Sequence, residues 1–131
     1  IDVVCSKDFD NESEQKIFDI TKIDNDFQGM DAGPKSLDLF EKVVMDSKTI
    51  LWNGPLGVFE FSNFSNGTKM LGHFISKSTK QGAFSLVGGG DSVAAVKKFK
   101  IENKMSYVST GGGAMLESLE GKDLPGINAL L

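Results

Sequence analysis

The sequence of 131 residues contains no arginine, so its 14 basic residues are all lysines. The planar guanidinium group, which binds a phosphate through two parallel hydrogen bonds, is therefore missing. Any phosphate chemistry at this chain must depend on backbone amides, a metal ion or another segment for much of its charge stabilisation. The net charge of −4 also argues against a surface that binds a nucleic-acid backbone.

Cysteine and histidine are equally scarce, with one residue of each. Cys5 alone cannot form an internal disulfide, and His73 alone cannot begin a conventional zinc cluster. No apolar run approaches the roughly 20 residues that cross a bilayer, and we find no signal-peptide pattern. These absences favour a cytoplasmic protein, although a mature protein of an organelle would have the same composition.

Apolar segments of strand length alternate with segments of helical periodicity along the chain. Strands are predicted at 1–5, 17–20, 49–52, 83–87 and 106–109, loops at 6–16 and 24–30, and helices at 34–45, 66–80, 92–99 and 114–119. This alternation predicts an α/β fold, a Rossmann-like parallel sheet with helices on both faces. The chain opens inside an expected strand, so we expect the later part of a longer protein and an incomplete sheet. Residues 1–131 are expected to form one structural unit.

Glycine-rich turns follow three successive predicted strands, at 53–57, 88–90 and 111–113. Ligands of parallel sheets bind outside the carboxyl ends of the strands, so all three turns should face one cleft. Three adjacent glycines at 88–90 let backbone amides approach an anion, and the following helix adds its positive dipole end. Asp91 follows directly, and either caps that helix or holds a cation that accompanies a phosphate.

Each feature also has a purely structural interpretation. The 88–92 segment lacks the Gly-Lys-Ser/Thr of a Walker loop, and Val93 and Leu116 occupy third-glycine positions of the dinucleotide pattern. Both turns are therefore also compatible with plain strand-to-helix connections. Glu60 is either a ribose-binding carboxylate or a solvated loop acid, and Met30 either lines a slot for a base or fills a gap.

Taken together, several segments closely resemble the carboxy-terminal domain of phosphoglycerate kinase, in family order, over nearly the whole chain. They are 29–36, 52–60, 88–92, 109–114 and 119–126. The family is a two-domain glycolytic kinase that transfers a phosphoryl group between 1,3-bisphosphoglycerate and ADP, giving 3-phosphoglycerate and ATP, with Mg²⁺. Its carboxy-terminal domain binds the nucleotide. The resemblance therefore implies that residues 1–131 are the later part of that domain.

The resemblance also implies roles for individual residues. Those of the nucleotide site would be Asn53, Pro55 and Gly57, with Glu60 on the ribose, Met30 at the adenine, and Ser92 beside Asp91. Asp91 would coordinate Mg²⁺ on the nucleotide phosphates. The amides that face the transferring phosphoryl group would be those of Gly89, Gly90, Gly112 and Gly113. Fixed amides at two helix N-termini suit a reaction in which catalysis is mostly positioning and charge neutralisation.

The family's catalytic arginine, its substrate-binding basic cluster and its phosphate-contacting lysines lie in segments that do not match this sequence. We therefore expect this chain to be inactive alone, and expect its tail from about residue 121 to pack on the amino-terminal domain, through which 3-phosphoglycerate would bind. The family implies a monomer without nucleic-acid or membrane partners. Two alternatives stay open, a non-catalytic nucleotide- or phosphate-binding module and, less favoured, part of a dinucleotide-dependent oxidoreductase.

Overall fold

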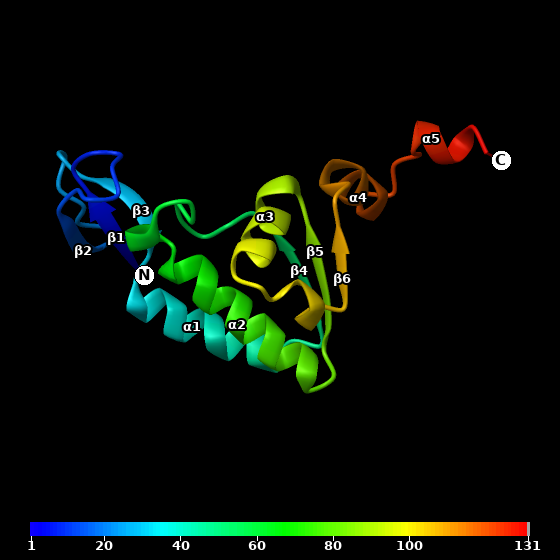
Figure 1. Cartoon of the computed structure of the whole chain (residues 1–131), viewed down its shortest axis with the longest axis horizontal. Helices are drawn as coiled ribbons and strands as arrows, with labels where there is room; N and C mark the ends of the chain where they lie inside the picture. Colours follow the sequence, from blue (N-terminus) through cyan, green and yellow to red (C-terminus); the bar gives the residue numbers. More distant parts are fainter. Residues whose placement is uncertain (131) are drawn as a thin grey trace.

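The computed structural model describes residues 1–130, and two three-stranded sheets are its main features (Figure 1). The sheet near the N-terminus has the strand order β2-β1-β3, and the second sheet has the order β4-β5-β6. Two long helices, α1 (Pro34–Asp46) and α2 (Asn66–Lys80), pack against each other and run from one sheet toward the other (Figure 1). No helix in residues 1–130 is both long enough and apolar enough to cross a bilayer.

The N-terminal sheet is antiparallel, which differs from the sequence-based expectation. β1 (Asp2–Ser6) lies between β2 (Gln15–Asp19) and β3 (Gln28–Ala32) and runs antiparallel to both. The expectation that residues 1–5 join the parallel sheet is therefore wrong, and the loop predicted at 24–30 instead leads into β3. The connections between these strands are short, whereas a parallel crossover needs a dozen or more residues.

The second sheet confirms the parallel α/β prediction. β4 (Thr49–Asn53) pairs in parallel with β5 (Phe84–Gly88), which pairs in parallel with β6 (Tyr107–Ser109). The crossover from β4 to β5 contains α2, and the crossover from β5 to β6 contains α3 (Gly90–Lys98). The chain then continues through α4 (Gly112–Leu119) to the short α5 (Pro125–Asn128), which projects away from the other elements (Figure 1).

One face of the parallel sheet forms the main core with helices α1, α2 and α3. Trp52 of β4 and Val87 of β5 are buried there against apolar side chains from the three helices. The helical members of this core are Leu37, Val44, Phe74, Ile75 and Val96. Side chains alternate between the two faces of a strand, so the neighbours of Trp52 and Val87 point to the other face.

That other face is apolar and largely uncovered within residues 1–130. Leu51, Phe84 and Tyr107 are 43%, 50% and 61% exposed, and Leu51 and Tyr107 flank Leu86 in register. α4 reaches this side only at the strand ends, where Met115 packs over Gly88. Helices on both faces, as the sequence predicts, are therefore not found in the described part of the chain.

Two buried carboxylates of the N-terminal sheet bind the N-termini of the long helices, whose own N-cap residues provide no side-chain bond. Asp2 accepts hydrogen bonds from the backbone N–H groups of Lys35 (3.1 Å) and Ser36 (2.8 Å) in α1. Asp31 accepts from the N–H of Gly67 (2.7 Å) in α2. Each carboxylate satisfies an unpaired donor and faces the positive end of a helix dipole, which attaches the sheet to the helices.

Candidate functional site

The three glycine-containing turns begin side by side at one edge of the parallel sheet. Asn53, the last residue of β4, pairs with Gly88 of β5, which in turn pairs with Ser109 of β6. Because the strands are parallel and end in register, the turns at 53–57, 88–90 and 111–113 all start at their carboxyl ends. The three turns therefore begin at one edge of the sheet, as the expectation that they face one cleft requires.

Gly89 lies between the other two turns and touches both. Its φ of 88° is in the left-handed region that glycine adopts without strain. A Cβ on Gly89 would lie 2.5 Å from Oδ1 of Asn53, and a Cβ on Gly112 would lie 2.5 Å from the Cα of Gly89. Neither position can hold a larger residue without movement, so bare backbone is required where the turns meet. In contrast, a Cβ on Gly90 or Gly113 would meet open space.

A hollow of about 230 Å³ lies between the first two turns. It is lined by Asn53, Gly54, Gly89, Gly90, Asp91 and Ser92. α3 begins at this hollow, so the unpaired N–H groups and the positive dipole end of the helix are directed toward it. The chemistry of this lining suits an anionic group such as a phosphate.

Asp91 is exposed in the first turn of α3 and does not cap it. The N-cap is Gly89, and no side chain makes a capping hydrogen bond. Within residues 1–130 the Asp91 carboxylate has no hydrogen bond and no ion pair, so the capping interpretation of Asp91 is wrong. A free carboxylate beside an anion-binding turn is a ligand that Mg²⁺ accepts when phosphate oxygens and water supply the others.

No group of three or more His, Cys, Asp or Glu side chains in the described residues could hold a metal ion by itself. A single carboxylate suits a cation that is already bound to the phosphates of a nucleotide better than a cation that is coordinated by protein side chains alone. Asp91 is the one carboxylate that lines the hollow.

Ser92 is fully buried and ties the two turns together. Its hydroxyl oxygen accepts a hydrogen bond from the N–H of Gly54 (2.6 Å), while the indole N–H of Trp52 donates to the carbonyl of Gly54 (2.7 Å). Both backbone polar groups of Gly54, the N–H and the carbonyl, are thus held by hydrogen bonds. The family resemblance placed Ser92 beside Asp91 at the helix start, but the sequence did not predict this supporting bond, which joins residues 38 positions apart.

A second hollow of about 520 Å³ contains Met30, Pro55 and Gly57, three of the predicted nucleotide-site residues. Met30 is 2% exposed, and its carbonyl accepts a hydrogen bond from Val58 (2.9 Å). The buried hydroxyl of Thr68 in α2 accepts from the N–H groups of Leu56 (3.2 Å) and Gly57 (3.4 Å). The hollow therefore lies between residues 55–58, strands β1 and β3, and the beginning of α1, while Thr68 of α2 supports the 53–57 turn beside it.

Asp31 is the buried acid at the base of this arrangement and was not predicted as a site residue. Its side chain packs against Gly57 and Gly67 so closely that neither could accept a Cβ. Burial raises the pKa of Asp31, and the hydrogen bonds from the N–H groups of Gly67 and Ala32 offset this only in part. No local pattern in the sequence distinguishes Asp31 from the exposed acids around it.

Glu60 is exposed and lines neither hollow. Its backbone is nevertheless held, because the Lys98 ammonium donates to the carbonyls of Phe59 (2.6 Å) and Glu60 (3.2 Å). Lys98 is the last residue of α3, the helix that begins beside Asp91.

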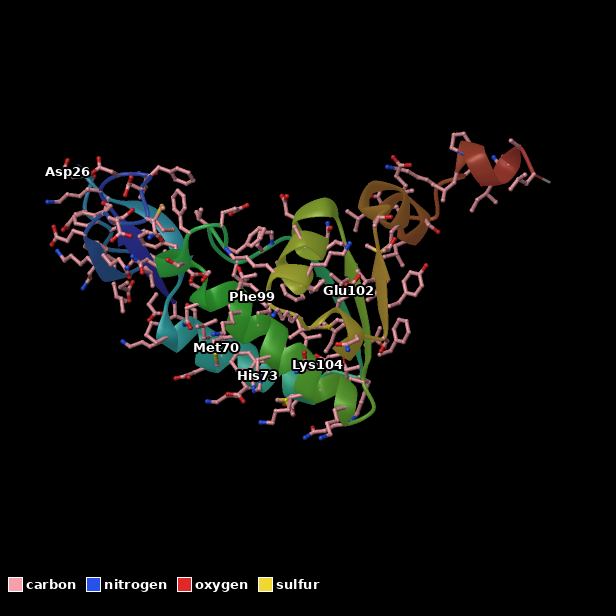
Figure 2. The ribbon with its side chains drawn as sticks, in the orientation of Figure 1. Asp26, Met70, His73, Phe99, Glu102 and Lys104 are labelled. Atoms are coloured by element: carbon pink, nitrogen blue, oxygen red, sulfur yellow. The ribbon has the colours of Figure 1, made fainter. Side chains whose placement is uncertain are left out.

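Another hollow, of about 570 Å³, lies away from the strand ends. It is lined by residues of α2 and of the 3-10 turn η2 (Glu102–Lys104), among them His73, Lys77 and Lys104 (Figure 2). None of the predicted site residues lines it, and its lysines are exposed. We therefore assign the candidate site to the strand ends.

Comparison with known proteins agrees with the motif resemblance. The sequence model of the family described as phosphoglycerate kinase matches residues 1–122. Similar curated proteins include the phosphoglycerate kinase of Porphyromonas gingivalis, 56% identical over 99% of this chain and 31% of that protein. The phosphoglycerate kinase of Thermosynechococcus vestitus is 48% identical over 98% of this chain and 32% of that protein.

Solved structures give the same result. Phosphoglycerate kinase from Coxiella burnetii superposes with a TM-score of 0.89 at 42% identity, over 97% of this chain and 32% of that one. The enzyme from Pyrococcus horikoshii gives a TM-score of 0.80 at 34% identity, over 98% of this chain and 31% of that one. The chain thus spans about a third of the length of these relatives, and it belongs to the phosphoglycerate kinase family.

Proposed function

We propose that this chain is the later part of a nucleotide-binding carboxy-terminal domain, and that it supplies the MgADP/MgATP site for phosphoryl transfer between 1,3-bisphosphoglycerate and ADP. The observation that carries the proposal is the contact of three turns at one sheet edge, around a hollow that Asp91 and the start of α3 line. The family assignment supplies the reaction.

Each predicted residue then has a role consistent with its place. Asp91 binds Mg²⁺ on the nucleotide phosphates, and Asn53, Gly89, Gly90 and Ser92 form the wall around them. Met30, Pro55 and Gly57 line the hollow that receives the adenine. Glu60 approaches the ribose from outside these hollows.

The chemistry assigned to the chain is orientation and charge neutralisation. Amides at the starts of α3 and α4, including those of Gly89, Gly90, Gly112 and Gly113, face the phosphoryl group as it moves. Mg²⁺ supplies further neutralisation of the phosphate oxygens when it is bound. No arginine in the sequence can contribute, so the remaining positive groups and the phosphoglycerate site belong to other segments of a protein of the relatives' length.

Those other segments also account for surfaces that are left uncovered. In such a protein, helices of the remaining segment would cover Leu51, Phe84 and Tyr107 and so complete the second face of the sheet. The tail from about residue 121, in which Ile127 is 55% exposed, would pack on the amino-terminal domain. The whole protein would be a cytoplasmic monomer.

A titration of the isotope-labelled chain with ADP, followed by amide NMR shifts with and without Mg²⁺, tests the nucleotide site. We expect weak binding, with a Kd on the order of 1 mM, because part of the site lies in other segments. Shifts should concentrate at 88–92 and 111–113 and should depend on Mg²⁺. Asp91→Ala should abolish the dependence on Mg²⁺, whereas Asp38→Ala, which removes an exposed acid of α1, should preserve it.

Four outcomes would contradict the proposal. Unchanged Mg²⁺ dependence in Asp91→Ala would remove Asp91 as a metal ligand. Micromolar binding of MgADP by the chain alone would favour the non-catalytic binding module instead, and tighter binding of NADH than of MgADP would favour the dinucleotide-dependent alternative. Kinase activity of the purified chain would show that no other segment is needed.

A further inference from the structure

Lys98 makes an unusual set of contacts for a lysine at the end of a helix. Its ammonium donates to two backbone carbonyls, those of Phe59 (2.6 Å) and Glu60 (3.2 Å), and lies 5.8 Å from the centre of the Phe59 ring. The ion pairs of the described residues do not include it. The Lys98 ammonium is therefore bound to backbone atoms of one short segment, which move less than the carboxylate of an acidic side chain would.

The two carbonyls depend on Lys98 in return. The segment is a tight turn, closed by hydrogen bonds from Phe59 to Gly57 and from Phe61 to Val58. No backbone N–H in residues 1–130 bonds to the carbonyl of Phe59 or Glu60. The Phe59 ring is 5% exposed, so the turn is anchored by a buried side chain on one side and by the Lys98 ammonium on the other.

α3 links this turn to the phosphate end of the candidate site. The helix starts beside the hollow that Asp91 lines and ends at Lys98, seven residues after Asp91, which corresponds to about 10 Å along its axis. Figure 2 labels Phe99, the residue that follows Lys98 at this end of α3. Lys98 therefore fixes the Glu60 backbone relative to the helix that carries Asp91.

We propose that Lys98 is a positioning residue for ribose recognition, holding the 59–60 turn against α3 so that the Glu60 carboxylate meets the sugar hydroxyls. The inference rests on the proposed nucleotide function. Lys98 itself does not touch the nucleotide. Without the Lys98 ammonium, the 59–60 turn should be able to move. The chain should then lose its preference for nucleotides whose ribose carries hydroxyl groups, while the phosphate contacts at 88–92 stay in place.

The experiment compares the binding of MgADP with that of its 2′,3′-dideoxy analogue, which lacks the hydroxyls, by NMR titration of the intact chain. The wild-type chain should prefer MgADP by a factor on the order of ten, as one or two hydrogen bonds to a carboxylate would give. In Lys98→Met the preference should fall to less than about twofold. The ratio is insensitive to a general loss of affinity or stability.

Two further variants separate positioning from a structural effect. Lys97→Met removes the neighbouring exposed lysine, which makes none of these contacts, and should keep the wild-type preference. Glu60→Gln should lose the preference, and adding Lys98→Met to it should reduce the preference no further. Retention of the wild-type preference by Lys98→Met would overturn the inference. Failure of the wild-type chain to bind MgADP would instead overturn the proposed function, and the inference with it.

Discussion

The contact between the turns at 88–90 and 111–113 predicts that two neighbouring glycines tolerate alanine very differently. A Cβ on Gly112 would meet the backbone of Gly89, which cannot rotate away as a side chain can. A Cβ on Gly113 would meet open space. Both residues lie in the first turn of α4, so their intrinsic helix preferences are matched.

The magnitude follows from two opposing effects. Alanine in place of glycine stabilises a helix by roughly 0.5–1 kcal/mol, and less in the first turn. Overpacking at a tight contact costs roughly 1–3 kcal/mol. We expect Gly112→Ala to lower the free energy of unfolding by about 1–2 kcal/mol, and Gly113→Ala to raise it by up to about 0.5 kcal/mol.

Urea denaturation measures this difference directly. With an m-value of about 2 kcal/mol/M, the unfolding midpoints of the two variants should differ by about 1 M. The m-values should be equal, since both variants expose the same surface on unfolding. Equal midpoints for Gly112→Ala and Gly113→Ala would show that the two turns are not in contact, and the argument for a shared phosphate wall would lose its structural basis.

The remaining predictions concern stability and its dependence on pH. Phe64→Ala, at a fully buried ring, should cost about 3–5 kcal/mol, whereas Phe84→Ala, at a half-exposed ring, should cost less than about 1 kcal/mol, both by urea unfolding. Burial raises the pKa of Asp31 in the folded state, so the contribution of Asp31 to stability is full below about pH 3.9 and is lost as the pH rises through the raised pKa. The free energy of unfolding of the wild type should therefore fall over that range relative to that of Asp31→Asn. Burial alone would also raise the pKa of Asp2, but hydrogen bonds from Ser36 and Lys35 hold this pKa below its usual value. The contribution of Asp2 to stability is therefore present above about pH 3.9 and is lost as the pH falls. The free energy of unfolding of the wild type should fall in acid relative to that of Asp2→Asn. Urea midpoints between pH 2.5 and about 7 test both, and the same sign of effect in the two variants would contradict the assignment.

The sequence predicts the parallel sheet and its helices well because their determinants are local. Apolar runs of strand length bounded by glycine locate β4, β5 and β6 to within one residue, and the helical spacing of Met70, Leu71 and Phe74 gives α2 the bounds that the structure has. The three glycine turns then mark the binding edge, because parallel strands place all their carboxyl ends together.

The N-terminal sheet was not predictable in the same way. Residues 1–5 have the composition of a central strand, and β1 is indeed central, but in a different sheet. An apolar composition indicates that both faces of a strand are buried, but it does not show which strands lie beside it. The supporting bonds of the site are equally hidden, since those of Ser92 to Gly54 and of Lys98 to Phe59 join residues 38 and 39 positions apart.

The two ends of the candidate site are held in place by different means. At the phosphate end, bare backbone contacts bare backbone, and Ser92 and Trp52 hold the Gly54 peptide between them. At the other end, the Asp31 carboxylate holds the first turn of α2, whose Thr68 in turn holds the 53–57 turn. Asp2 also lines the hollow around Met30, and its contribution to stability is lost as the pH falls, whereas a glycine contact does not titrate. Acidic conditions should therefore disturb the hollow around Met30 before they disturb the phosphate turns. Amide NMR shifts followed to low pH would detect that order, and simultaneous loss of both ends would show that they form one rigid unit.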